Sequence, residues 1–240
     1  ALVCVTLLLP VPYVTMRPGP TFNTLGEFDG KQMLTFGRGV KTYPDRGTIN
    51  FTTVMVSGAD ARVTLFDAMS AYFAEDNSVV PRKLIYRIGE SSTQSKKESQ
   101  QQLTSSKDSS TVAALRAAGY TVPEKAIVAG VFKKAPAAGR LHAGDVVVEA
   151  AGRKATSAQA VVQAVASRKP GDKVTVVVQR KGKLRSVTMR TVADSTDPTK
   201  PRIGILLGSK FTFPVKVSNQ VGDRIGGPSA GGMFALAIYD

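Results

Sequence analysis

The sequence predicts an α+β protein built from more than one domain. Its 240 residues suffice for two modest cores, and the hydrophobic share of 42% is typical of globular chains. The residue pattern also changes along the chain. An uncharged apolar run comes first, mixed helix and strand patterns follow, and a regular series of short strands begins near residue 124. We therefore expect a membrane-anchor segment, a mixed α/β region and two further domains.

Residues 1–16 are apolar, and the first charged residue is Arg17. A spanning helix needs about 20 apolar residues. This run is shorter, but it lacks an initiator Met, so we expect the chain to be cut at its start. Tyr13 and the prolines beside it suit the membrane interface. We predict that 1–16 is the C-terminal part of a transmembrane anchor, with a signal-peptide remnant or a core strand as the alternatives.

Residues 17–123 mix turns, strands and helices. The β-branched run 48–56 predicts a strand, and the spacing of large apolar side chains predicts a helix over 65–73. We expect a loop over 76–81 and a short strand over 84–88. The polar stretch 90–110 is either a linker or a solvated helix pair that ends at Gly119. We favour the helices, because the apolar residues that follow continue at helical spacing.

Residues 124–193 show a regular order of elements. We predict a strand, a short helical turn, a second strand, an amphipathic helix, and two strands joined by the Lys181-Gly182-Lys183 hairpin. The ranges are 127–132, 135–139, 146–150, 157–167, 174–178 and 186–189. A linker over 194–202 precedes Ile203-Gly204-Ile205, and a further strand covers 213–217.

A motif of small residues, Gly226 to Gly232, lies just before an apolar helical run that ends at Tyr239. It contains Pro228 and a single serine, Ser229. One interpretation is that Ser229 is a nucleophile exposed at the positive end of a helix. The other is that Ser229 is the helix N-cap, which serine does well. We favour the nucleophile.

Composition excludes several kinds of site. The chain has one Cys, Cys4, and one His, His142, so we expect neither an internal disulfide nor a metal site, and no cofactor. No phosphate-binding P-loop sequence occurs. His142 is expected in a solvated loop, and Cys4 is expected to be inert. The net charge of +14 comes from scattered basic residues without interleaved aromatics, so we expect no nucleic-acid partner.

Residues 126–190 resemble a bacterial PDZ domain. The matching residues include Ala135 to Leu141, Ala143 to Val147, Gly152 and Pro170-Gly171-Asp172. The resemblance implies a module that binds extended chain ends by strand addition beside the helix 157–167. The apolar-Gly-apolar loop that usually binds the carboxylate is missing before the first strand. A permuted arrangement would let Ile203-Gly204-Ile205 take its place, or this triplet starts the next domain.

Gly227-Pro228-Ser229-Ala230-Gly231, after a strand and a loop, resembles the nucleophile motif of the Lon-type proteolytic domain. An acidic residue is common in Lon where this chain has Gly226, and the ATPase domain of Lon is absent. Both departures suit the membrane-anchored, ATP-independent, PDZ-containing Lon-like peptidases of bacteria. Further matches to them include Pro12-Tyr13, Pro18-Gly19-Pro20, Thr52-Thr53-Val54, Val80-Pro81 and Ala235 to Asp240. The domains expected from these resemblances are 1–16 anchor, 17–123 mixed region, 124–193 PDZ and 194–240 truncated Lon-type domain.

The Lon-like resemblance implies a serine endopeptidase with a Ser-Lys dyad. Ser229 would be the nucleophile, and the backbone amides of Ala230 and Gly227 would stabilise the oxyanion. The lysine base would lie downstream of Asp240, so this chain alone would be inactive. Neither Lys210 nor Lys216 occupies the family position.

The partners implied are protein or peptide substrates and the membrane, on the extracytoplasmic side. The sequence leaves open whether the protein is a homo-oligomer. The first alternative to the enzyme is a membrane-anchored PDZ adaptor without enzymatic activity. A basic surface protein that binds anionic lipid or nucleic acid is the weaker third hypothesis, and it predicts steep salt dependence.

Overall fold

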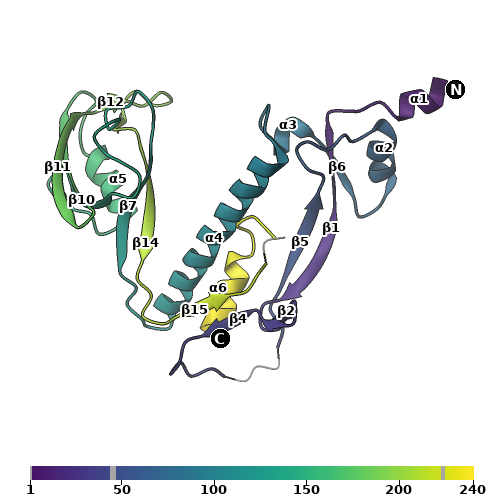
Figure 1. Ribbon diagram of the computed structural model, residues 1–240, viewed down its shortest axis with the longest axis horizontal. Coiled ribbons are helices and arrows are strands. Elements are labelled where there is room, and N and C mark those ends of the chain that lie inside the picture. Colours follow the sequence, from purple (N-terminus) through teal and green to yellow (C-terminus); the bar gives the residue numbers. More distant parts are fainter. Residues whose placement is uncertain (1, 44–46, 223–224) are drawn as a thin grey trace. The chain divides into compact units, whose positions relative to one another are not determined.

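The computed structural model describes residues 2–43, 47–222 and 225–240 (Figure 1). The chain divides into two compact units. Unit 1 contains residues 1–121 and 215–240, and unit 2 contains residues 122–214. Unit 2 is therefore an insertion within unit 1, and it continues past residue 193, the predicted end of the PDZ domain. The sequence Tyr43-Pro44-Asp45-Arg46-Gly47 also predicts a turn, and its three central residues lie outside the described part of the chain.

A three-stranded antiparallel sheet forms one part of unit 1, with strand order β5-β1-β6. Its strands are β1 (Tyr13–Asn23), β5 (Asn50–Val56) and β6 (Ser78–Pro81). Two small strand pairs accompany it: β2 (Glu27–Phe28) with β3 (Lys31–Gln32), and β4 (Leu34–Phe36) with β15 (Val217–Asn219). The segment 76–81 is thus partly a strand, where the sequence predicted a loop.

The helices of unit 1 are α1 (Leu2–Leu7), α2 (Leu65–Phe73), α3 (Arg82–Ile85), α4 (Ser92–Ala117) and α6 (Gly231–Tyr239). The predicted helix 65–73 is confirmed as α2. The predicted strand 84–88 is wrong, because residues 82–85 form the short helix α3. None of the described helices combines the length and apolarity needed to cross a bilayer. Residues 13–16 of the predicted anchor belong to β1.

The polar stretch after residue 90 is one helix of 26 residues, α4, rather than a linker or a helix pair. The Ser91 side chain caps its start by accepting a hydrogen bond from the Gln94 amide. Gly119, with φ of +86°, follows the last turn of α4, and the Tyr120 amide donates a hydrogen bond to the Leu115 carbonyl. α4 lies beside α6 (Figure 1). Leu103 on α4 and Phe234 on α6 belong to one buried cluster.

Unit 2 is built on an antiparallel sheet with strand order β11-β10-β8-β7-β14, and β9 pairs with β8. Its elements are β7 (Glu124–Val131), β8 (Val146–Ala150), β9 (Arg153–Lys154), α5 (Ala158–Ala166), β10 (Lys173–Arg180), β11 (Lys183–Arg190), β12 (Val192–Ala193), β13 (Pro201–Arg202) and β14 (Ile205–Phe211). Alternate residues of β10, Val174, Val176 and Val178, are buried with Val161 and Val165 of α5. The elements predicted for 126–190 are all present.

Candidate functional site

The turn that carries Ser229 directly precedes α6 in unit 1. Ser229 is exposed, and its neighbour Ala230 is buried. The N-cap of α6 is Ala230, with no side-chain cap hydrogen bond. The alternative in which Ser229 caps the helix is therefore not what the structure shows. Ser229 is thus an exposed serine at the start of a helix, where the partial positive charge of the helix dipole favours a developing anion.

Helix α4 holds the Ser229 turn through hydrogen bonds to its backbone. The Ser106 hydroxyl donates to the Pro228 carbonyl at 2.9 Å, and the Gln100 side chain donates to the Ile225 carbonyl at 2.8 Å. In the other direction, the Gly227 amide donates to the Ser99 carbonyl at 2.9 Å. Ser99 and Ser106 are seven residues apart, which places them about two turns apart on the same face of α4. Helix α4 thus fixes the backbone of residues 225–228, directly before Ser229.

Two glycines of the motif allow the turn to approach α4 closely. A Cβ atom on Gly226 would lie 2.8 Å from Cβ of Ser99, and one on Gly231 would lie 2.5 Å from the Ser106 hydroxyl. Gly227 is different: its φ is +91°, and an added Cβ would meet nothing within 4 Å. The glycines therefore serve the packing against α4 as well as the backbone conformation.

The predicted oxyanion donors differ in their availability. The Gly227 amide is engaged by Ser99 in this conformation. Among the residues that the structure describes, the amides of Ser229 and Ala230 donate to no protein group. Both amides therefore remain without an acceptor among the described residues, although Ala230 is buried and Ser229 is exposed.

Ser229 lines a cavity of about 570 Å³. Its lining includes the motif residues Ile225, Gly226, Gly227 and Ala230, residues 52–55 of β5, and the apolar side chains Phe22, Phe28, Phe51 and Leu103. The ring centroids of Phe22 and Phe28 are 5.1 Å apart, and those of Phe22 and Phe51 are 5.5 Å apart. No lysine or histidine lines the cavity in the described part of the chain. The cavity presents the Ser229 hydroxyl beside apolar side chains, and its one charged lining residue among those described is Asp29.

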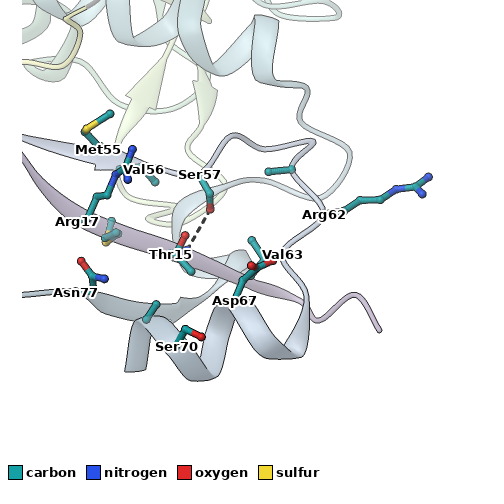
Figure 2. Close-up of a pocket in the computed structure, with 13 residues that line it drawn as sticks. Thr15, Arg17, Met55, Val56, Ser57, Arg62, Val63, Asp67, Ser70 and Asn77 are labelled. Carbon is teal, nitrogen blue, oxygen red and sulfur yellow. Dashed lines mark hydrogen bonds between the residues drawn. The ribbon is translucent and has the colours of Figure 1, made fainter. Parts of the chain in front are cut away.

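A second cavity of unit 1, of about 530 Å³, lies between β1, β5 and α2 (Figure 2). Figure 2 shows the Thr15 amide donating to the Ser57 hydroxyl oxygen, at 3.1 Å. Asp67 lines this cavity, but Thr64 donates to it through its hydroxyl and its amide, at 2.7 and 2.9 Å. Those hydrogen bonds lower the pKa of Asp67. Asp67 is a helix-capping carboxylate, so this cavity is not the candidate site.

A groove in unit 2 lies between β14 and α5. It has a volume of about 310 Å³, and its lining includes Val161, Val162 and Val165 of α5, with Ile205 and Leu207 of β14. In the described residues β14 pairs with β7 on one side only, so its other edge is unpaired (Figure 1). An unpaired edge beside an apolar helix face is the geometry that accepts an added peptide strand.

The triplet Ile203-Gly204-Ile205 leads into this edge strand. The Gly204 carbonyl accepts from the Phe132 amide at 3.0 Å, and the Ile203 carbonyl accepts from the Ala137 amide at 3.0 Å. Gly204 has φ of +74°, and a Cβ atom there would lie 2.1 Å from Cβ of Ala135. Of the two alternatives for the triplet, the structure supports the permuted arrangement, because β14 belongs to the sheet of unit 2 and begins at Ile205.

A buried ion pair fixes the loop after the turn 135–141. Arg180 donates to both carboxylate oxygens of Asp145 at 2.6 Å, and the His142 amide donates to the same carboxylate at 2.9 Å. Burial acts to raise the pKa of Asp145, but the hydrogen bonds and charge of Arg180 outweigh it, so the pKa is lowered. His142 itself is exposed, as predicted.

Comparisons with known proteins bear mainly on unit 2 and on the residues of unit 1 that precede it. Residues 87–191 match the family described as PDZ domain. The PDZ domain of an SdrC-like protein from Listeria monocytogenes is 32% identical to this chain over an alignment covering 34% of this chain and 85% of that one, with a TM-score of 0.32. The chain contains a PDZ domain.

Two further solved structures are similar to the PDZ domain of this chain. The PDZ domain of an SdrC-like protein from Listeria innocua is 33% identical, covers 35% of this chain and 92% of its own, and has a TM-score of 0.32. A protein from Geobacillus thermodenitrificans is 28% identical, covers 33% of this chain and 92% of its own, and has a TM-score of 0.30. No curated protein matches this chain.

The residues missed by sequence reasoning are those of α4. Ser99, Gln100 and Ser106 position the Ser229 turn, yet they lie in the stretch for which a linker remained an alternative. The signal that would have found them is a helical spacing in the sequence: the serines at 99, 106 and 110 lie three or four residues apart once Leu103 is included.

Proposed function

We propose that this protein binds extended peptide segments in the groove between β14 and α5 of its PDZ domain. The observation that carries the proposal is the unpaired edge of β14, entered through Ile203-Gly204-Ile205 and faced by the apolar side of α5. A peptide added to this edge would extend the sheet by backbone hydrogen bonds, and its alternate side chains would enter the apolar groove. Protein or peptide ligands are therefore the partners.

We further propose that Ser229 is the nucleophile of a serine endopeptidase. The support is its exposure at the start of α6, the amides of Ser229 and Ala230 that have no acceptor among the described residues, and the largely apolar cavity beside it. The hydroxyl oxygen would attack a peptide carbonyl while a lysine amine accepts its proton, and the two amides would stabilise the oxyanion. The lysine is the one that the Lon-like resemblance places after Asp240. The aromatic lining suits an apolar substrate side chain.

Membrane tethering through residues 1–16 is part of the same proposal, with the two units on the extracytoplasmic side. Its support is the exposed apolar side chains of Val3, Val5, Leu8 and Leu9. Helix α2, which contacts α1, adds a second apolar surface: Ala68 and Ala71 face inward, and the larger Phe66, Met69, Tyr72 and Phe73 are exposed. Exposed aromatic side chains of this kind are enriched at membrane interfaces.

The peptidase proposal is tested in a protein that contains this chain and the sequence downstream of Asp240. The readout is cleavage of quenched fluorescent peptides with apolar residues at the scissile position, and the variant is Ser229→Ala. We expect cleavage to be abolished while peptide binding to the PDZ groove persists. Undiminished cleavage by Ser229→Ala would exclude Ser229 as nucleophile. If the unsubstituted protein binds peptides and cleaves none, the adaptor alternative holds.

A further inference from the structure

The positive charge of this protein is concentrated in its PDZ unit. Residues 122–214 contain 17 of the 32 Lys and Arg residues but only six of the 18 Asp and Glu residues, a net charge of +11. Unit 1, which is larger, contributes the remaining +3 of the total of +14. An excess of this size over one small unit creates a positive potential that attracts acidic ligands and speeds their association.

Five of the six acidic residues of this unit are committed to internal partners. Asp145 binds Arg180, Asp194 contacts Arg202, and Asp197 pairs with Lys200. Glu124 accepts from the Ala158 amide and the Ser209 hydroxyl, and Asp172 accepts from the Lys169 amide. The sixth, Glu149, lies cross-strand from Lys154. The six carboxylates of the unit are therefore too few to neutralise its 17 Lys and Arg side chains, and an acidic ligand would find uncompensated positive charge there.

Two of these cations line the proposed peptide groove, and two more lie on its edge strand β14 and on the neighbouring strand β7. Lys200 and Arg202 line its end near Gly204, and both side chains are largely exposed despite their contacts with Asp197 and Asp194. Further along β14, the exposed Lys210 lies directly opposite the exposed Lys125 of β7 in the sheet register. The groove thus has cations at one end and along its edge strand.

The Lys210–Lys125 pair is unfavourable for the sheet itself. Like charges directly opposite each other on neighbouring strands destabilise an antiparallel pair. Both lysines lie on the face of the sheet away from the core, because their neighbours Ala126 and Val128 on β7 alternate to the buried side. A carboxylate placed beside them would relieve this repulsion. A peptide added to the free edge of β14 would bring alternate side chains to that same face.

We infer that the PDZ groove selects peptides with acidic side chains, Asp or Glu, along the segment that pairs with β14. The inference rests on the proposed function, since it specifies the ligand of the same groove. Apolar residues of the peptide enter the pocket beside α5, and acidic residues on the opposite face meet Lys210 and Lys125. The cations at Lys200 and Arg202 add to the attraction near the end of the groove.

The test compares two fluorescently labelled peptides by anisotropy with the whole chain. They share an apolar C-terminal segment and differ upstream, where one has Glu and the other Gln at every second position. Because Gln is close to Glu in size, only charge differs. We expect the Glu peptide to bind about three- to tenfold more tightly at low salt, from a few exposed charge pairs. The difference should shrink as salt is raised, since screening weakens exposed pairs.

Matched variants assign the preference to the groove. Lys210→Gln combined with Lys125→Gln should reduce the Glu-over-Gln preference to about twofold or less, because the pairs that create it are removed. Arg185→Gln, an exposed position on β11 at the opposite edge of the sheet, should leave most of the preference intact. Affinity for the Gln peptide should be unchanged in all of these variants, which shows that the groove still folds.

Equal affinity for the two peptides would overturn the inference and leave peptide recognition standing. Binding of neither peptide would overturn both the inference and the proposed groove function. A third outcome is tight binding to phosphatidylglycerol vesicles or duplex DNA without any Glu preference. That result would overturn the inference and assign the positive charge of the unit to another class of ligand.

Discussion

The Ser106 hydroxyl on α4 donates a hydrogen bond to the Pro228 carbonyl, directly before Ser229. This contact joins residues that are 122 positions apart in sequence, with the whole PDZ unit between them. The position of the candidate nucleophile is therefore set by a helix whose sequence is mostly polar and poor in apolar residues.

The close packing of α4 against the Ser229 turn predicts that alanine substitutions at two neighbouring glycines change the stability of unit 1 differently. Gly231→Ala should lower the free energy of unfolding of unit 1 by about 1–3 kcal/mol, because its Cβ would lie 2.5 Å from the Ser106 hydroxyl. Gly232→Ala meets nothing within 4 Å and should be neutral or stabilise by up to about 1 kcal/mol through helix propensity. Urea denaturation checks both, and equal effects would contradict the close approach.

Replacement of the candidate nucleophile should leave stability unchanged. Ser229 is exposed, and the N-cap position belongs to Ala230, so Ser229→Ala should change the free energy of unfolding by less than about 0.5 kcal/mol. If Ser229 were a helix cap, the same change would cost about 1 kcal/mol. A chemical denaturation curve of the two proteins distinguishes these cases.

The Asp145–Arg180 pair predicts how the stability of the PDZ unit depends on pH. The pKa of Asp145 is lowered in the folded state, so its contribution is present above its unfolded value of about 3.9 and is lost as the pH falls through the folded pKa. Arg180→Gln should destabilise the unit near neutral pH, because it leaves the buried Asp145 carboxylate without its cation.

The same Arg180→Gln variant should also lose part of the acid-dependent fall in stability below about pH 4, because the carboxylate no longer has its partner. Thermal melting over a pH series provides the measurement. Arg185→Gln serves as the control, since Arg185 is exposed. Parallel pH profiles for Arg180→Gln and the unsubstituted protein would exclude the pair as the cause.

Gly204 should be required for peptide binding. Gly204→Ala combines a positive φ of +74° with a Cβ contact of 2.1 Å to Ala135, so the loop must move and β14 with it. We expect at least a tenfold loss of affinity for a peptide that binds the groove, about 1.4 kcal/mol. Gly130→Ala on β7, where the nearest contact is 3.8 Å, is the matched control and should bind normally.

The tether proposal predicts that α2 meets lipid. The chain contains no Trp, so Tyr72→Trp places a single fluorophore on the exposed face of α2. On mixing with phosphatidylcholine vesicles its emission should shift to shorter wavelength and be quenched by brominated lipid. Tyr239→Trp on α6, which is also exposed, should show neither change. An unchanged Tyr72→Trp spectrum in the presence of vesicles would argue against an interfacial role.

Sequence patterns predicted best the elements whose side chains pack locally. Helix α2 matches its predicted range 65–73, because the Thr64–Asp67 capping box and the apolar spacing act within one turn. The elements of residues 126–190 follow in the predicted order for the same reason. Helix α3 was predicted wrongly as a strand, since distant groups hold it: Arg82 binds the carbonyls of Ala59 and Ala61, and Tyr86 binds that of Ser57.

At the candidate sites, the sequence showed the motif residues but not the residues that position them. Ser229 and the Ile203-Gly204-Ile205 triplet were visible as motifs, because their chemistry resides in residue type. The partners that position them were not visible. β14 reaches the sheet by pairing with β7, from Phe211 opposite Glu124 to Ile205 opposite Val131, and α4 binds the Ser229 turn from more than 100 residues away. Such long-range pairings leave no local pattern in a single sequence.

The insertion of the PDZ unit between α4 and α6 affects the order in which the protein can mature. During synthesis α4 leaves the ribosome before the insert and α6 leaves after it. The buried cluster that contains Leu103 and Phe234 therefore cannot form until the entire insert has been made. The insert enters on β7 and leaves on β14, and these two strands are hydrogen-bonded neighbours. When β7 and β14 pair, the two ends of the insert are brought close together. The chain segments of unit 1 before and after the insert then start from neighbouring points, which lowers the loop-closure entropy that α6 must lose to pack against α4.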